Sequence, residues 1–247
     1  MPSTLVARGW LPVAVPSLAI LGGLGPMLSA LFVGALVGRG VVEQVFRPLL
    51  RVRVNPVWCV VVPGFWIAVA VVAALVVASG TVGERLFVWF AWPEFVLGFA
   101  GSLVSNVWEE IGWRGFALPR LAERWGDLVA SVWLGLVGFL WHLPLLLDPR
   151  SPMSQLSWPL QAVFLVAMSV LLTWVYRGTG GSLWWVTVFH AMSNAVALGM
   201  LQAKLFVASY PVVVFLVAVA ALSVAIRYGR WSFAVSRDSA DSEASRR

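Results

Sequence analysis

The chain has 247 residues, of which 60% are hydrophobic and only 11% are charged, and its formal net charge is +6. Soluble domains are typically about 25% charged, so this composition excludes an ordinary water-soluble protein and predicts an integral membrane protein. The basic residues lie in short segments between apolar runs, which favours membrane topology over nucleic acid binding. The single cysteine, Cys59, has no partner within the chain, so no disulfide framework is expected.

Seven apolar runs follow one another along the chain, each long enough to cross a hydrocarbon core of about 30 Å at about 1.5 Å per helical residue. We therefore predict an all-α, polytopic transmembrane helical bundle of about seven spans, within a range of six to eight. The first run is too long for the apolar region of a signal peptide and lacks a clear cleavage site, so it is assigned as a span. The expected runs are 11–37, 57–79, 95–117, 128–147, 160–176, 182–201 and 210–226.

One domain is expected, because the chain shows no internal repeat and no second region that could bury a core of its own. Residues 1–230 would form the membrane bundle, with a functional core at about 95–200. Residues 231–247 are rich in serine and in charges of both signs, which predicts a disordered cytoplasmic tail.

Most arginines lie in every second connection between the runs and in the C-terminal tail. The other connections carry fewer basic residues, interspersed with acidic ones. Cytoplasmic loops are enriched in arginine and lysine, so this alternation predicts a multi-pass protein of the cell membrane with its N-terminus outside and its C-terminus in the cytoplasm. The arginines concerned are Arg39, Arg47, Arg51, Arg53, Arg120, Arg124, Arg177, Arg227, Arg230 and Arg237.

Two glutamates and two histidines lie inside the apolar runs. Glu109 and Glu110 are in the third run, and the only two histidines of the chain, His142 and His190, are in the fourth and sixth. An ionisable group within a membrane costs about 2.5 to 3.5 kcal/mol on insertion scales, so such groups need partners or a water-filled cavity. We therefore expect the four residues to converge on one site.

The third run separates the roles of its two glutamates. Glu110 precedes Arg114 by one helical turn in the favourable order of acid before base, so the two side chains are expected to pair. Glu109 is rotated by about 100° around the helix and stays free to act as a base. The alternative is a buried charge network of both glutamates and Arg114 that only fixes helix packing.

The histidine-bearing runs add further polar groups. His190 and Asn194 are four residues apart and share one helix face, while Pro144 is expected to end or bend the helix just after His142. A carboxylate, two imidazoles and an amide suit peptide hydrolysis, in which Glu109 takes a proton from water and polar donors stabilise the oxyanion.

A metal site is an open alternative for the same residues. His142, His190 and Glu109 could bind a divalent metal, with zinc the first choice and a fourth position left for water. Asparagine is an uncommon zinc ligand, and the HExxH helix is absent. A serine or cysteine nucleophile is less favoured, because Ser193 has no evident base and Cys59 is distant in sequence from the motifs.

Three segments resemble the motifs of the CPBP family of intramembrane peptidases, which includes the type II CAAX prenyl endopeptidases and proteins linked to bacteriocin processing and immunity. The segments are EEIGWRGF at 109–116, FLWHLP at 139–144 and HAMSN at 190–194. The family usually has phenylalanine four residues before the second-motif histidine, whereas this chain has Gly138 there and Phe139 one place later. The resemblance covers about residues 95–200.

The resemblance implies a role for each motif residue. Glu109 would activate the water, His142 would contribute to the same centre, and His190 and Asn194 would bind the metal or stabilise the oxyanion. Glu110 and Arg114 would support them. Whether family members use a bound metal or glutamate-activated water alone is left open by these residues.

The sequence thus predicts an intramembrane endopeptidase, a CAAX-type protease that cleaves a membrane-associated peptide or protein in or near the bilayer. One alternative is a non-catalytic scaffold or immunity-type protein that keeps the pocket. A proton-coupled transporter is a third reading, although the chain lacks the repeated halves of such folds. The pattern assigns neither a particular substrate nor an oligomeric state.

Overall fold

The computed structural model describes residues 16–38, 40–77, 92–229 and 231–233. These ranges contain helices and no strand, which confirms the all-α prediction. The seven longer helices correspond one by one to the seven expected apolar runs. Residues 11–15 of the first run, 78–79 of the second and 234–247 of the expected tail lie outside the described ranges. The helices are α2 (Pro16–Val37), α3 (Val41–Phe46), η1 (Arg47–Leu50), α4 (Val57–Val77), α6 (Trp92–Glu110), η2 (Ile111–Ala117), α7 (Leu118–Leu147), η3 (Pro152–Gln155), α8 (Trp158–Gly178), α9 (Leu183–Gln202) and α10 (Phe206–Tyr228).

Five described stretches are long and apolar enough to cross a membrane: Val57–Val77, Phe95–Leu147, Trp158–Gly178, Leu183–Gln202 and Phe206–Tyr228. The second of them contains both α6 and α7, and the apolar part of α2, Gly23–Leu36, is shorter. The chain is therefore a polytopic helical bundle.

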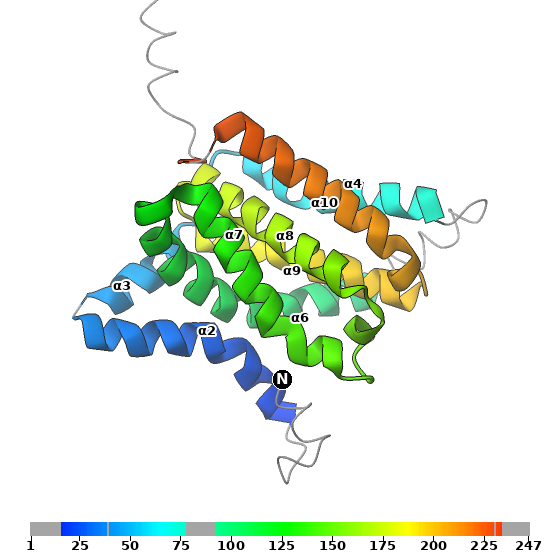
Figure 1. Ribbon diagram of the computed structural model, residues 1–247, viewed down its shortest axis with the longest axis horizontal. Coiled ribbons are helices and arrows are strands. Elements are labelled where there is room, and N and C mark those ends of the chain that lie inside the picture. The colour runs from blue at the N-terminus through cyan, green and yellow to red at the C-terminus, as the bar shows by residue number, and fades with distance from the viewer. Residues whose placement is uncertain (1–15, 39, 78–91, 230, 234–247) are drawn as a thin grey trace, which may run out of the picture.

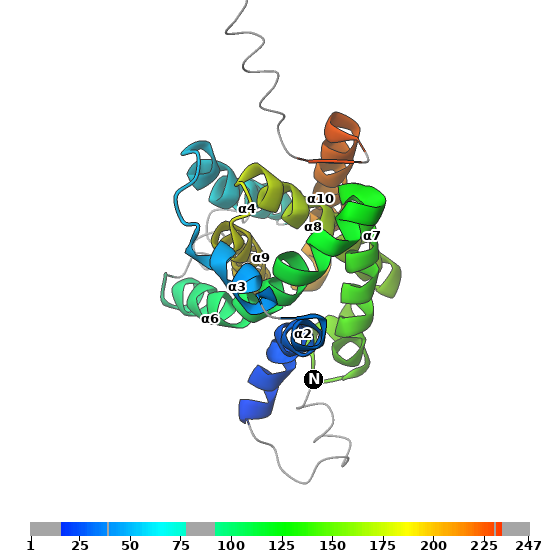
Figure 2. The same cartoon turned by 90° about the vertical axis from the view of Figure 1, so that its left-hand side faces the viewer.

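Helix α9 lies inside the bundle and has the largest buried share among the candidate spans. It packs against α6, α4, α8 and α10, while α7 packs on the other side of α8. Figures 1 and 2 show α2 on the periphery, where it contacts α6 and η2. The two motif-bearing helices α6 and α9 are thus held face to face, and α7 reaches them from the side.

The expected loop between the third and fourth runs is helical instead. After α6 the chain passes through η2, a π-helical segment, and continues directly into α7. Residues 118–125 include good helix formers, and Pro119 occupies a first-turn position where its missing N–H costs nothing. The helix is interrupted at Gly126, whose φ of 80° and ψ of 165° suit glycine and disfavour other residues. The continuation past Pro144 to Leu147 also shows that this proline does not end α7.

Asp127 ties the interruption at Gly126 to the far end of the chain. Its buried carboxylate forms an ion pair with Arg177 of α8 at 2.8 Å and accepts the backbone N–H of Phe233 at 2.8 Å. Phe233 is fully buried and lies against the Tyr228 ring. The beginning of the expected tail therefore packs against the bundle, because its aromatic side chain can be removed from water there.

The arginine-bearing helix ends gather at one end of the bundle. The α2–α4 connection, the start of α7, the α8–α9 turn and the end of α10 all lie at the left of Figure 1, and the α7–α8 and α9–α10 connections lie at the right. The clustering agrees with the arginine pattern of the sequence. Which side of a membrane this end faces stays a prediction.

Gly135 is the point of closest approach between α7 and α8. A Cβ atom at this position would lie 2.5 Å from Val166 Cα and 2.9 Å from Leu165 O, both of them backbone atoms of α8. We predict that Gly135→Ala lowers the free energy of unfolding by about 1 to 3 kcal/mol, because the backbones must separate. The thermal midpoint of the detergent-purified protein tests this. Gly101→Ala on α6, where the added Cβ meets no atom within 4 Å, is the control and should leave the midpoint unchanged or raise it. Equal midpoints for the two variants would contradict the prediction.

Candidate functional site

A cavity of about 190 Å³ lies between α6, α7, α8 and α9 and extends to η3 and α10. Five of the six motif residues line it, and the sixth, Glu110, lies just behind the wall and is fully buried. The structure therefore brings together side chains from three separate sequence motifs. The five lining residues are Glu109, Arg114, His142, His190 and Asn194.

Glu110 and Arg114 form the pair that their spacing predicts. Arg114 Nη1 donates to Glu110 Oε1 at 3.2 Å and lies 3.2 Å from Oε2. Both side chains are buried, and the second terminal nitrogen of the guanidinium, Nη2, donates to Ser169 Oγ of α8 at 3.1 Å. An arginine enclosed in this way needs a carboxylate beside it, because an unpaired charge would be costly to bury.

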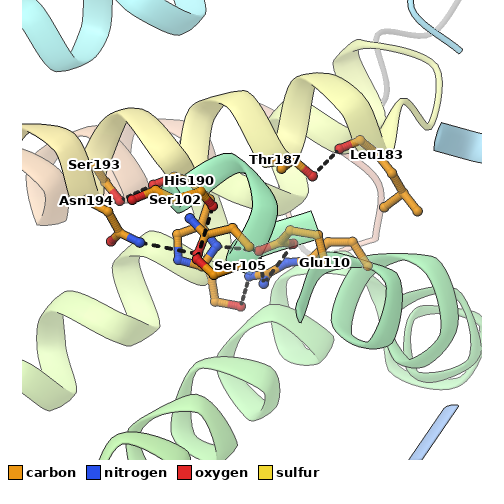
Figure 3. Close-up of polar contacts among 11 residues, drawn as sticks. Ser102, Ser105, Glu110, Leu183, Thr187, His190, Ser193 and Asn194 are labelled. Carbon is orange, nitrogen blue, oxygen red and sulfur yellow. Dashed lines mark hydrogen bonds and ion pairs between the residues drawn. The ribbon is translucent and has the colours of Figure 1, made fainter. Parts of the chain in front are cut away.

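His190 contacts Glu110 directly. Its Nδ1 lies 2.7 Å from Glu110 Oε1, and Figure 3 shows the two side chains facing one another from α9 and α6. A carboxylate on Nδ1 fixes the orientation of an imidazole, as in many catalytic histidines. This contact turns His190 Nε2 away from the carboxylate. The supporting role expected for Glu110 stays a prediction.

Glu109 has a different environment from its neighbour. Within the described part of the chain, no hydrogen bond or ion pair engages its carboxylate. It lines the cavity, whereas Glu110 does not. The geometry thus separates the two glutamates as the helical period predicts, with one held in a network and the other facing open space.

His142 is oriented by its own helix. Its Nδ1 donates to the carbonyl oxygen of Gly138, one turn earlier in α7, at 2.8 Å. The ring nitrogen left for water or a substrate is then Nε2. Gly138 occupies the position where the resemblance leads one to expect phenylalanine, and the contact uses its backbone carbonyl, which any residue there would supply.

Asn106 was missed by the sequence reasoning. Asn194 Nδ2 donates to Asn106 Oδ1 at 3.2 Å, and Asn106 is buried on α6 one turn before Glu110. The available signal was an uncharged polar residue inside an apolar run at helical spacing from the glutamates. This contact uses one N–H of the Asn194 amide and leaves the second one available.

The described ranges contain no group of three or more His, Cys, Asp or Glu side chains arranged to hold a metal ion. The Nδ1 atoms of both histidines already have protein partners, Glu110 for His190 and Gly138 for His142. The zinc site drawn from Glu109, His142 and His190 stays a prediction from the sequence.

The fold and the site define a class: a polytopic helical membrane protein with a free carboxylate, two oriented imidazoles and an amide around one cavity. Residues 90–196 match the family model described as Type II CAAX prenyl endopeptidase Rce1-like. The chain is also similar to "CAAX prenyl protease 2" of Methanococcus maripaludis, with 31% identity over 98 residues that cover 37% of this chain and 36% of that protein. The chain thus spans about a third of the length of the curated relative that it matches. These findings agree with the resemblance of the three motifs to the CPBP family, and the matched segment contains all six motif residues.

Proposed function

We propose that the chain is an intramembrane endopeptidase that hydrolyses a peptide bond with water activated by Glu109. The observation that carries the proposal is the contrast between the two adjacent glutamates. Glu110 is bound by Arg114 and His190, while Glu109 lines the cavity without a hydrogen-bonding partner among the described residues. A carboxylate that must accept a proton from water needs this freedom.

The proposed reaction has two proton transfers. The water oxygen attacks the peptide carbonyl carbon while Glu109 takes a proton from the water. The negative charge that develops on the carbonyl oxygen is stabilised by the free N–H of Asn194 and by Nε2–H of a protonated His190, whose ring Glu110 orients. When the tetrahedral intermediate collapses and the C–N bond breaks, Glu109 returns the proton to the leaving amine. His142 Nε2 orients the attacking water.

The cavity wall indicates the kind of substrate. Away from the glutamates it is mostly apolar, and one buried polar pair, Gln161 and Tyr210, interrupts it. An apolar wall suits a membrane-embedded or membrane-associated peptide segment, which would lose little hydration on entry. We propose that residues 95–200 form the functional core and that the arginine-rich end of the multi-pass bundle faces the cytoplasm.

Proteolysis of a tagged membrane-peptide library by the purified protein in liposomes tests the proposed function. We expect cleavage by the wild-type protein, with products identified by mass spectrometry. No cleavage of any peptide, together with an intact fold, would favour a non-catalytic binding protein that keeps the pocket.

Removal of divalent metals tests the chemistry at the same site. Because the proposed mechanism relies on side chains alone, we expect dialysis against a chelator to change the cleavage rate by less than twofold. Loss of cleavage with the chelator and its recovery with added zinc would instead assign a metal to Glu109, His142 and His190.

Asn106 provides a test of the oxyanion donor. We predict that Asn106→Leu lowers kcat about tenfold, because the Asn194 amide loses the acceptor that orients it; loss of an oxyanion donor itself costs about 100- to 1,000-fold. Single-turnover cleavage assays measure the change. Ser102→Ala, one turn earlier on α6, is the control and should retain wild-type kcat. An unchanged kcat in Asn106→Leu would show that Asn194 needs no such support.

A further inference from the structure

Helix α8 carries none of the three sequence motifs, yet one of its serines reaches the motif network. Ser169 Oγ accepts a hydrogen bond from Arg114 Nη2 at 3.1 Å and lines the same cavity. The relative exposures of Ser169, Arg114 and Glu110 are 3%, 5% and 0%. Polar contacts at such depth are strong, because little water competes for them.

These contacts form a continuous relay from α8 to α9. Ser169 holds one terminal nitrogen of Arg114, the other terminal nitrogen holds Glu110 Oε1 at 3.2 Å, and the same oxygen holds His190 Nδ1 at 2.7 Å. Both terminal nitrogens of Arg114 are hydrogen-bonded only while the serine hydroxyl is present. Without it, the guanidinium can rotate, and the carboxylate that orients the imidazole loses its fixed position.

The position of Ser169 is itself braced by the neighbouring helix. Its backbone carbonyl accepts the hydroxyl of Thr173 at 2.9 Å, and Thr173 accepts the hydroxyl of Ser131 of α7 at 2.8 Å. Ser131 Oγ also lies 2.6 Å from the carbonyl of Asp127. This ladder of small polar groups fixes α8 against α7 at the level of the site, so the Ser169 hydroxyl is placed before any substrate binds.

We infer that Ser169 is a positioning residue, which acts through Arg114 and Glu110 to hold His190 with its Nδ1 proton on the carboxylate and its Nε2 toward the cavity. The catalytic consequence of this relay rests on the proposed function, but the relay itself does not. Its first test therefore uses a signal that is independent of catalysis.

The chain has only two histidines, so ring ¹⁵N labelling gives one set of signals from His190 and one from His142. In wild-type protein we expect a narrow Nδ1–H resonance for His190, assigned with His142→Gln. Ser169→Ala should broaden or abolish it, and Ser169→Thr, which keeps the hydroxyl, should restore it. Thr187→Val removes a buried hydroxyl of α9 that bonds only the Leu183 carbonyl of its own helix, and it should leave the resonance unchanged. The His142 resonance, held by Gly138, is the internal control.

The kinetic test uses the peptide-cleavage assay. Ser169→Ala should lower kcat about tenfold with KM within twofold of wild type, and Ser169→Thr should recover kcat to within threefold. In an Arg114→Lys background, Ser169→Ala should cost less than twofold, because the serine acts through the guanidinium.

Each result separates the inference from the proposed function. An unchanged His190 resonance in Ser169→Ala, or equal broadening in Thr187→Val, would overturn the relay whether or not the protein cleaves peptides. If Ser169→Ala broadens the resonance but the wild-type protein cleaves no peptide, the relay is supported and the proposed peptidase function is not. A full tenfold loss that persists in the Arg114→Lys background would instead mean that Ser169 touches the substrate.

Discussion

Replacement of Glu109 by glutamine is expected to lower kcat at least about a thousandfold, within the range of about 100- to 10,000-fold typical for loss of general acid–base catalysis. Glutamine keeps the size of the side chain and cannot take a proton from water. Because Glu109 forms no ion pair in the described part of the chain, the thermal midpoint should change little. Single-turnover cleavage in liposomes, with the melting curve of the same preparation, measures both quantities.

The control for this variant is Glu123→Gln, which makes the same chemical change at an exposed position of α7 and should leave kcat unaltered. Residual activity within tenfold of wild type in Glu109→Gln would contradict the proposed role of the carboxylate. A comparable loss in both variants would point to a general effect of charge on the bundle instead of to the chemistry of the cavity.

The local part of the site could be predicted from the sequence because helical geometry fixes it. The pairing of Glu110 with Arg114 and the separate direction of Glu109 both follow from the spacing of residues along one helix. The apolar runs likewise predicted the seven longer helices, since the thickness of a bilayer sets their length.

The remaining contacts join residues that are far apart in the chain, and no local rule reveals them. His190 meets Glu110 across 80 positions, and Arg114 meets Ser169 across 55. Single hydroxyl groups in apolar helices most often bond to their own backbone, so Ser169 carried no distinctive signal. The sequence analysis expected a loop between the third and fourth runs because of the charges of Arg120 and Arg124. Arginine has a high helix propensity, and the segment from η2 to Gly126 is helical.

Glu110→Ala is expected to lower the free energy of unfolding by about 3 to 5 kcal/mol, the cost of leaving one partner of a buried ion pair unpaired. Arg114 would keep its contact with Ser169, but its charge would have no carboxylate in the described network, and His190 would lose the acceptor of Nδ1. Equilibrium unfolding of the detergent-solubilised protein measures the change. Glu43→Ala, at an exposed glutamate of α3, should stay within about 0.5 kcal/mol of wild type.

A second substitution shows whether the destabilisation comes from the orphaned charge. In Glu110→Ala/Arg114→Leu no arginine charge remains to be buried, so much of the lost stability should return, because apolar replacement of a whole buried pair is often neutral. Cleavage should not return with it, since His190 stays without its carboxylate. Stability without activity in the double variant would mean that the network is kept for the orientation of His190, whereas a double variant as unstable as Glu110→Ala would assign the glutamate a packing role that does not depend on Arg114.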